Sequence, residues 1–150
     1  MIPLNGAEHR RSIYVQARRS RPLAVLDTFD WPRMSPNCDI RRPTTGAPQS
    51  LMLMNSDFVL DYADSFAARV ASEAGEDRRD QVTCAWRLAF CRTPDESEIA
   101  SATAFLDDQT TLFLERSGGD NADDAPTPQQ RALSSLCQML FSSNEFLYVD

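Results

Sequence analysis

The stretch "SDFVLDYADSFAARVASEAG", residues 56–75, decides the fold of this 150-residue chain. Large apolar side chains recur in it every four residues, at Phe58, Tyr62, Phe66 and Val70. Smaller apolar residues flank that row, at Val59, Ala63 and Ala67. This spacing predicts one amphipathic helix, with a single apolar stripe formed by both sets. Asn55 or Ser56 is expected to cap its start, and Gly75 lies where it ends.

The strongest start signal in the chain is "TPDE", residues 93–96. Thr93 is a good N-cap, Pro94 suits the first helical position, and Glu96 completes a capping box. The sequence therefore predicts that a long helix begins with Thr93 as its cap.

Two other helices complete the expected set. One covers about residues 78–90, and the other starts at "TPQQ", residues 127–130, and stops near Ser143. Residues 144–150 then form an apolar tail. The apolar positions expected to face the core of these three helices are Val82, Ala85, Trp86, Ala89, Ile99, Ala102, Leu106, Phe113, Leu133, Leu136, Cys137, Leu140 and Phe141.

Residues 1–50 lack this periodicity. Proline, which fixes φ and lacks the amide hydrogen, interrupts residues 20–50 at Pro22, Pro32, Pro36, Pro43 and Pro48. We expect an all-α fold, with about four helices in a bundle over residues 51–150. An extended Pro/Arg-rich arm over residues 1–50 precedes the bundle.

The segment "RRPTTGAPQSLMLMN", residues 41–55, joins these two parts. Pro43, Gly46 and Pro48 are expected to prevent regular structure. Residues 51–54 are apolar on every side, which is typical of a buried segment. We interpret the segment as a structural joint, with a ligand-binding loop as the alternative.

Five residues are the candidate contacts. Arg41 and Arg42 would tie the arm to helical carboxylates or carbonyl ends, because guanidinium groups carry several donors. Gln49 and Asn55 would be the polar contacts if the segment binds a ligand. Trp31 is the one aromatic residue considered for stacking on a ligand, since Trp86 lies on an apolar face.

Charge is distributed unevenly. All 15 basic residues are arginine, so lysine chemistry is excluded. Residues 1–42 hold eight arginines and four acids, whereas residues 43–150 hold seven arginines and eighteen acids. The basic arm would bind either the acidic bundle or an external polyanion. The overall charge of −7 would repel a polyanion, so nucleic acid is the weaker prediction.

Catalytic and cofactor motifs are missing from the sequence. The four cysteines form no CxxC or CxxCH, and His9 is the only histidine, so neither haem nor a tightly held metal is expected. No GxSxG, P-loop or GxGxxG occurs. Asp57, Asp61 and Asp64 share a helical face, which indicates either a solvated surface or a site for a hard cation. No apolar stretch approaches the ~20 residues of a membrane span, and the N-terminus is not a secretory signal.

Four ordered segments carry a resemblance to a known family: "RRSIYVQARRSRPLAVLDTFDWP", "CDIRRPTTGAPQSLMLMNSDFV", "AWRLAFCRTPDESE" and "LCQMLFSSNEFLYVD". Together they cover residues 10–150 and resemble the C-terminal half of a planctomycete-specific family, domain of unknown function fifteen-fifty-three. The resemblance implies a large exported protein in which a cytochrome c-like domain comes first, and hence a periplasmic or cell-surface location. It implies no established activity.

The chain departs from that family in two respects. It lacks the upstream half of the domain, which suggests a fragment or a truncated gene prediction. Cys91 stands where the family usually has glycine in a G-R-x-P turn. Cysteine tolerates positive φ poorly, so its presence argues against a tight left-handed turn at this point.

The resulting functional hypothesis is a C-terminal structural or interaction module of a larger exported, cytochrome-linked protein. The alternative is part of a catalytic or carbohydrate-binding protein whose site is completed by upstream segments. The expected partners are upstream segments of the same protein or a partner chain, and an anionic polysaccharide is a further candidate. We expect one apolar patch to stay exposed until such a partner covers it.

Overall fold

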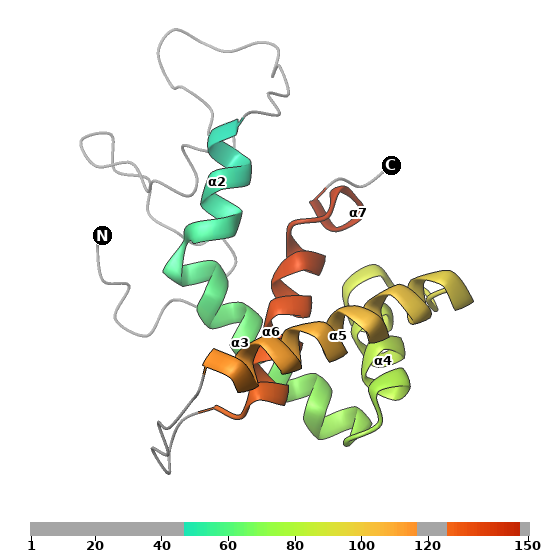
Figure 1. Ribbon diagram of the computed structural model, residues 1–150. Helices are drawn as coiled ribbons and strands as arrows, with labels where there is room; N and C mark the ends of the chain where they lie inside the picture. The colour runs from blue at the N-terminus through green and yellow to red at the C-terminus, as the bar shows by residue number, and fades with distance from the viewer. Residues whose placement is uncertain (1–46, 117–125, 148–150) are drawn as a thin grey trace, which may run out of the picture. The chain divides into compact units, whose positions relative to one another are not determined.

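The computed structural model describes residues 47–116 and 126–147, which form six α-helices and no strand (Figure 1). The helices are α2 (Ala47–Asn55), α3 (Asp57–Ala74), α4 (Arg78–Phe90), α5 (Glu96–Arg116), α6 (Pro128–Phe141) and α7 (Asn144–Leu147). The predicted all-α class is therefore confirmed for the described part. The chain divides into two units, residues 1–52 and 53–150.

The boundaries of α3 follow the expected signals. Ser56 is its N-cap, and the Ser56 carbonyl accepts hydrogen bonds from the amides of Val59 and Leu60 at 2.9 and 3.0 Å. At the other end Gly75 has φ 72°, and its amide donates to the Ala71 carbonyl at 2.9 Å. A positive φ at this position favours glycine, which has no Cβ, so the helix stops here.

Side-chain caps set the starts of α4 and α6. The Asp77 carboxylate accepts from the amides of Arg79 and Asp80 at 2.9 and 3.1 Å, which starts α4 one residue later. In α6 the predicted capping box is confirmed. The Gln130 amide donates to Thr127 Oγ1 at 3.2 Å, and the Thr127 amide donates to Gln130 Oε1 at 2.8 Å. Both caps satisfy amides that have no partner within the helix.

The capping box predicted for α5 is wrong in register. The helix begins at Glu96, and Asp95 acts where Thr93 was expected. The Glu98 amide donates to Asp95 Oδ1 at 2.7 Å, and the Asp95 amide donates to Glu98 Oε2 at 2.8 Å. The sequence offers two overlapping boxes two residues apart, and the second is used because Arg92 also holds the Glu98 carboxylate.

Three further expectations are corrected at the ends of the helical part. Pro48 lies within α2, because the first turn of a helix tolerates a residue without an amide hydrogen. The apolar segment after it is not buried throughout, since Leu51 is 59% and Met54 63% exposed. The start of the expected apolar tail forms the short helix α7, whose last amide, that of Leu147, donates to the Ser143 carbonyl at 3.2 Å.

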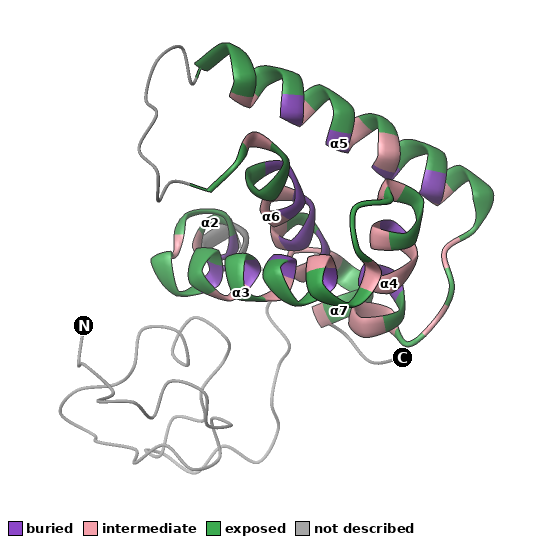
Figure 2. Ribbon diagram, turned by 90° about the horizontal axis from the view of Figure 1, so that it is seen from below, coloured by how far each residue is buried: buried purple, intermediate pink, exposed green. Residues whose placement is uncertain are grey.

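The core lies around α6, whose most extensive contacts are with α5 and α3, and α4 packs against both of these helices. Figure 2 shows the buried positions of these helices as purple bands. The core residues are Ala63, Ala67, Val70, Val82, Ala85, Trp86, Ile99, Ala102, Leu106, Ala132, Leu133, Leu136, Cys137 and Leu140. Most of the predicted core positions of α4, α5 and α6 are confirmed, whereas Ala89, Phe113 and Phe141 are only partly buried.

On α3 only part of the expected apolar stripe is buried. The buried positions, here named the core row, are Val59, Ala63, Ala67 and Val70. Three large aromatic residues of the same helix lie beside this row, with Phe58 exposed and Tyr62 and Phe66 half-buried. Small side chains let two helices approach closely, so the alanines of the core row meet α6 and the rings lie at the edge of that contact.

Cys91 adopts the left-handed conformation that its side chain argued against. Its φ is 57° and its ψ is 23°, and its amide donates to the Arg87 carbonyl at 3.1 Å to end α4. The expectation that cysteine would prevent a left-handed turn is therefore wrong. The turn keeps the geometry in which glycine is preferred and bears the steric cost of a Cβ.

Candidate functional site

Two of the five predicted contact residues lie in the described part of the chain. Gln49 is buried in the first half of α2, and Asn55 is exposed at its last position. Both make interactions of their own. Trp31, Arg41 and Arg42 lie outside the described residues, so their proposed roles stay predictions.

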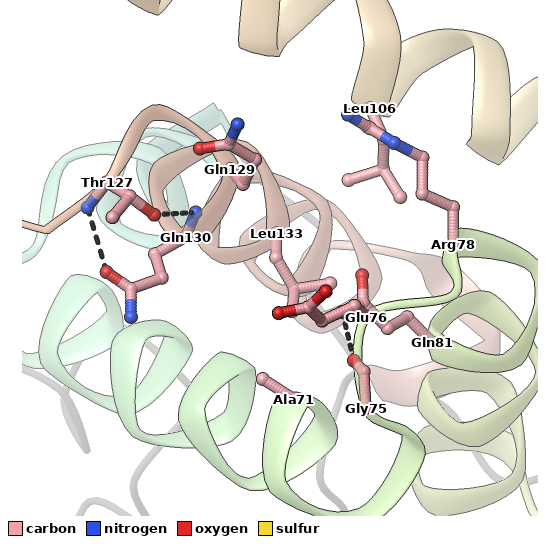
Figure 3. Close-up of a pocket in the computed structure, with 10 residues that line it drawn as sticks. All are labelled: Ala71, Gly75, Glu76, Arg78, Gln81, Leu106, Thr127, Gln129, Gln130 and Leu133. Carbon is pink, nitrogen blue, oxygen red and sulfur yellow. Dashed lines mark hydrogen bonds between the residues drawn. The ribbon is translucent and has the colours of Figure 1, made fainter.

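A pocket of about 640 Å³ opens where α3, α4, α5 and α6 meet (Figure 3). Six of its ten lining residues have polar side chains, and these six come from the turn after α3 and the starts of α4 and α6. The lining residues are Ala71, Gly75, Glu76, Arg78, Gln81, Leu106, Thr127, Gln129, Gln130 and Leu133.

Much of this polar lining already supports the fold. Gln81 Nε2 donates to the Gly75 carbonyl at 2.6 Å, and Gln130 belongs to the α6 capping box. Arg78 forms an ion pair with Asp107 at 3.2 Å and donates to Thr110 Oγ1 at 3.4 Å. Among the described residues, no aromatic side chain lines the pocket, and so none of them offers a ring on which a sugar would stack. The pocket therefore supports neither a reaction nor the carbohydrate alternative.

Two pairs of side chains resemble a nucleophile beside an acid. Cys84 Sγ lies 3.9 Å from Glu73 Oε2, but burial and then the nearby carboxylate raise the pKa of the Cys84 thiol. The thiolate, which is the reactive form, is therefore disfavoured. Ser134 donates a hydrogen bond to the Asp64 carboxylate. No described histidine stands between them to take the serine proton, so this pair lacks the base of a catalytic triad.

Metal binding by the acids of α3 also receives no support. Within residues 47–116 and 126–147, no group of three or more histidine, cysteine, aspartate or glutamate side chains is placed to hold a metal ion. Of the helices described, none combines the length and apolarity needed to cross a membrane.

One arginine binds two carboxylates from distant parts of the chain, and we name this group the Arg92 clamp. Arg92 donates to both oxygens of Glu98, at 2.6 and 2.7 Å, and to both oxygens of Glu145, at 2.6 and 2.9 Å. The guanidinium also lies 5.7 Å from the centre of the Phe90 ring. Arg92 follows α4, Glu98 lies in α5 and Glu145 in α7, so the clamp joins three helices.

The clamp shifts the protonation of both acids. Hydrogen bonds from Arg92 and then from the Asp95 amide lower the pKa of Glu98 to about 2. Arg92 likewise lowers the pKa of Glu145. Both carboxylates are therefore ionised near neutral pH. The buried Trp86 Nε1 makes no hydrogen bond of ordinary geometry to a described residue, although the indole contributes slightly to the low pKa of Glu98.

A row of aromatic rings crosses from α3 over α6 to α7, and we name it the aromatic stripe. Its members are Phe58, Tyr62, Phe66, Phe141 and Phe146. Ring centres are 4.7 Å apart for Phe58 and Tyr62, 5.3 Å for Phe66 and Phe141, and 5.1 Å for Phe141 and Phe146. Tyr62 and Phe66 are helical neighbours four residues apart.

The two ends of the aromatic stripe are open to solvent. Phe58 is 36% and Phe146 42% exposed, while the three rings between them are half-buried. Phe146 follows Glu145 directly, so the Arg92 clamp also positions the last ring. The sequence signal for this surface was the four-residue spacing of the rings on α3. From the sequence alone this spacing predicts a core face, and it carries no sign of the ring contacts with α6 and α7.

Residues 4–106 match a protein family described as PSD1, a protein of unknown function (DUF1553). The chain belongs to this family. No curated protein and no solved structure matches it.

The PSD1 match ends within α5, so it includes only part of each surface described above. Of the Arg92 clamp, Arg92 and Glu98 lie inside the match and Glu145 lies beyond it. The three stripe residues of α3 are also inside, whereas those of α6 and α7 are beyond it. The closing segment that carried part of the resemblance, residues 136–150, lies outside the PSD1 match.

Proposed function

We propose that this chain is a helical interaction module of a larger protein and that the aromatic stripe is its docking surface. The stripe's open ends carry the proposal: Phe58 is 36% and Phe146 42% exposed, although a packed core lies close by. Rings of this size contribute strongly to binding when a partner covers them. The stripe is also held in a fixed shape, by ring contacts along it and by the Arg92 clamp at its end.

The larger protein is, in this proposal, an exported one with a cytochrome c-like domain, located in the periplasm or at the cell surface. The resemblance of four ordered segments to the family supports it. The partners are upstream segments of the same protein or a partner chain. A catalytic or carbohydrate-binding site completed by upstream segments is the second candidate, and it has less support because the polar pocket lacks the side chains for either task.

The test compares the 150-residue chain with a version extended upstream by the preceding gene sequence. Hydrogen exchange of residues 57–66, the melting temperature and the size in solution are measured for both. We expect the extension to slow exchange in this segment and to raise the melting temperature. Phe58→Ser should remove both effects, whereas Leu114→Ser, at an exposed leucine of α5, should leave them in place.

Unchanged exchange and melting in the extended protein would contradict docking by upstream segments. If the chain is also a stable monomer, and no partner chain encoded in the same operon binds the stripe residues, the module is self-sufficient and the proposal is overturned.

A further inference from the structure

The α3 edge of the aromatic stripe carries unpaired negative charge. Asp57 and Asp61 lie one helical turn apart beside Phe58 and Tyr62, and both are exposed. Neither carboxylate forms an ion pair with any described residue. No basic residue occurs between Leu51 and Ala68 in the sequence.

The nearest arginine on α3 is already engaged. Arg69 binds Glu73 at 2.7 Å, one turn further along the helix. The open end of the stripe at Phe58 therefore combines an aromatic face with two carboxylates, and no arginine in residues 47–116 or 126–147 pairs with them. A partner that brings cations and apolar groups together would satisfy both features.

From this combination we infer that the occupant of the aromatic stripe is a peptide segment in which arginines alternate with apolar side chains. The inference rests on the proposed docking function and names the partner for the same surface. A guanidinium placed between Asp61 and the ring of Phe58 would pair with the carboxylate and stack on the ring. Lysine offers the charge without the planar fork, and so it fits this position less well.

The described part of the chain places a guanidinium over an aromatic ring twice, once together with bound carboxylates. Arg92 lies 5.7 Å from the centre of the Phe90 ring while it binds two glutamates. Arg131 lies 5.9 Å from the centre of the Phe113 ring. In both places a guanidinium covers a half-buried ring at the edge of the core, whereas at Phe58 no described arginine takes this position.

Charge also disfavours the other occupants. Two copies of this chain joined through the Phe58 end of the same surface would bring Asp57 and Asp61 of each copy close to those of the other. An anionic polysaccharide or a nucleic acid would meet the same carboxylates. Like charges at an interface weaken association, so we expect these partners to bind this surface less tightly than a cationic one.

The experiment titrates the full 150-residue chain with a short synthetic peptide that alternates arginine with leucine and tyrosine. Two matched peptides replace every arginine with lysine or with glutamine. We expect the arginine peptide to bind most tightly, the lysine peptide less tightly and the glutamine peptide least. The preference should weaken as salt is added, because exposed charges are screened.

Two charge variants locate the contact. Asp57→Asn/Asp61→Asn should weaken binding of the arginine peptide by about tenfold, as expected for two exposed ion pairs. Asp108→Asn/Glu115→Gln removes the same charge from exposed positions of α5 and should leave binding unchanged. Equal losses in both double variants would show a general charge effect and overturn the inference.

Phe58→Ser separates this inference from the docking function itself. If it abolishes binding of all three peptides while the aspartate variants bind normally, the stripe is a docking surface and the arginine preference is wrong. If Phe58→Ser leaves binding unchanged, both proposals fail. Concentration-dependent dimers that Phe58→Ser dissolves would assign the surface to a second copy and also overturn the inference.

Discussion

On α3, the core row lies beside three aromatic residues, Phe58, Tyr62 and Phe66, and the two sets differ in burial. Ala63 is fully buried, whereas Phe58, one turn earlier and a much larger apolar side chain, is 36% exposed. Size and burial are therefore inverted along α3. The comparison teaches that a close helix contact selects small side chains, and that large rings beside it remain available for a second contact.

The largest effect on stability should come from a substitution in the core that the core row of α3 contacts. Leu136, fully buried in α6, leaves a cavity when replaced by alanine, and we expect Leu136→Ala to lower the unfolding free energy by about 3 kcal/mol. Leu114→Ala, at an exposed leucine of α5, should change it by no more than about 0.5 kcal/mol. Chemical denaturation of both variants measures the difference.

A second prediction tests the inversion directly. Ala63→Leu adds methylene groups to the α3–α6 contact, and overpacking of this kind should cost about 2 kcal/mol. Phe58→Ala should cost less than about 1 kcal/mol, because much of the ring is already in solvent. If urea unfolding finds Phe58→Ala to be less stable than Ala63→Leu, the inverted relation of size and burial is wrong.

A third prediction concerns the left-handed turn at Cys91. A variant stabilised there would make the small effects of substitutions at Phe58 easier to measure. Cys91→Gly removes the Cβ from a residue at φ 57° and should raise the unfolding free energy by about 1 kcal/mol. Cys91→Ala keeps the Cβ and serves as the control, with no gain expected. Gly75→Ala should have the reverse effect: the new Cβ meets no atom within 4 Å, so only the backbone strain of φ 72° counts. Thermal melting of the three variants gives the signs.

The smallest effect should come from the Arg92 clamp, because its partners are partly exposed and solvent screens them. The pKa of Glu98 falls from 4.5 in the unfolded chain to about 2 in the fold. Since the folded pKa is the lower one, ionised Glu98 stabilises the fold above pH 4.5, and this contribution is lost as the pH falls toward 2. Wild type and Glu98→Gln should therefore melt at different temperatures at pH 6 and converge in acid. Asp108→Asn is the matched control, and a Glu98→Gln difference that persists at pH 2 would speak against the clamp.

Helix positions were largely predictable from the sequence because their signals are local. The boundaries of α4 and the capping box at Thr127 depend on residues within one turn, and both were found. The start of α5 was missed by two residues because two boxes overlap in "TPDESE". In the second box, the Glu98 carboxylate also binds Arg92, and Arg92 is held in turn by Glu145, 53 residues further along the chain. The helical start of α2 was missed because Pro48 was treated as a breaker rather than as a first-turn residue.

The candidate site was harder to predict because it consists of long-range contacts. Nothing in the spacing of Phe58, Tyr62 and Phe66 shows that their row continues through Phe141 to Phe146. The periodicity also fits either row of α3 as the core face. Only the position of α6 decides between them, and that position depends on residues far along the chain.

The three described cysteines differ in a way that makes the fold accessible to chemical labelling. Cys91 is exposed, Cys84 is half-buried with a raised pKa, and burial raises the pKa of Cys137 to about 12. A thiol reagent reacts with the thiolate, so it reaches Cys91 first and Cys84 more slowly. It reaches Cys137 only when the helices around α6 separate. The rate at which Cys137 becomes labelled therefore reports how often the core opens, and any partner that seals the aromatic stripe over α6 should slow it.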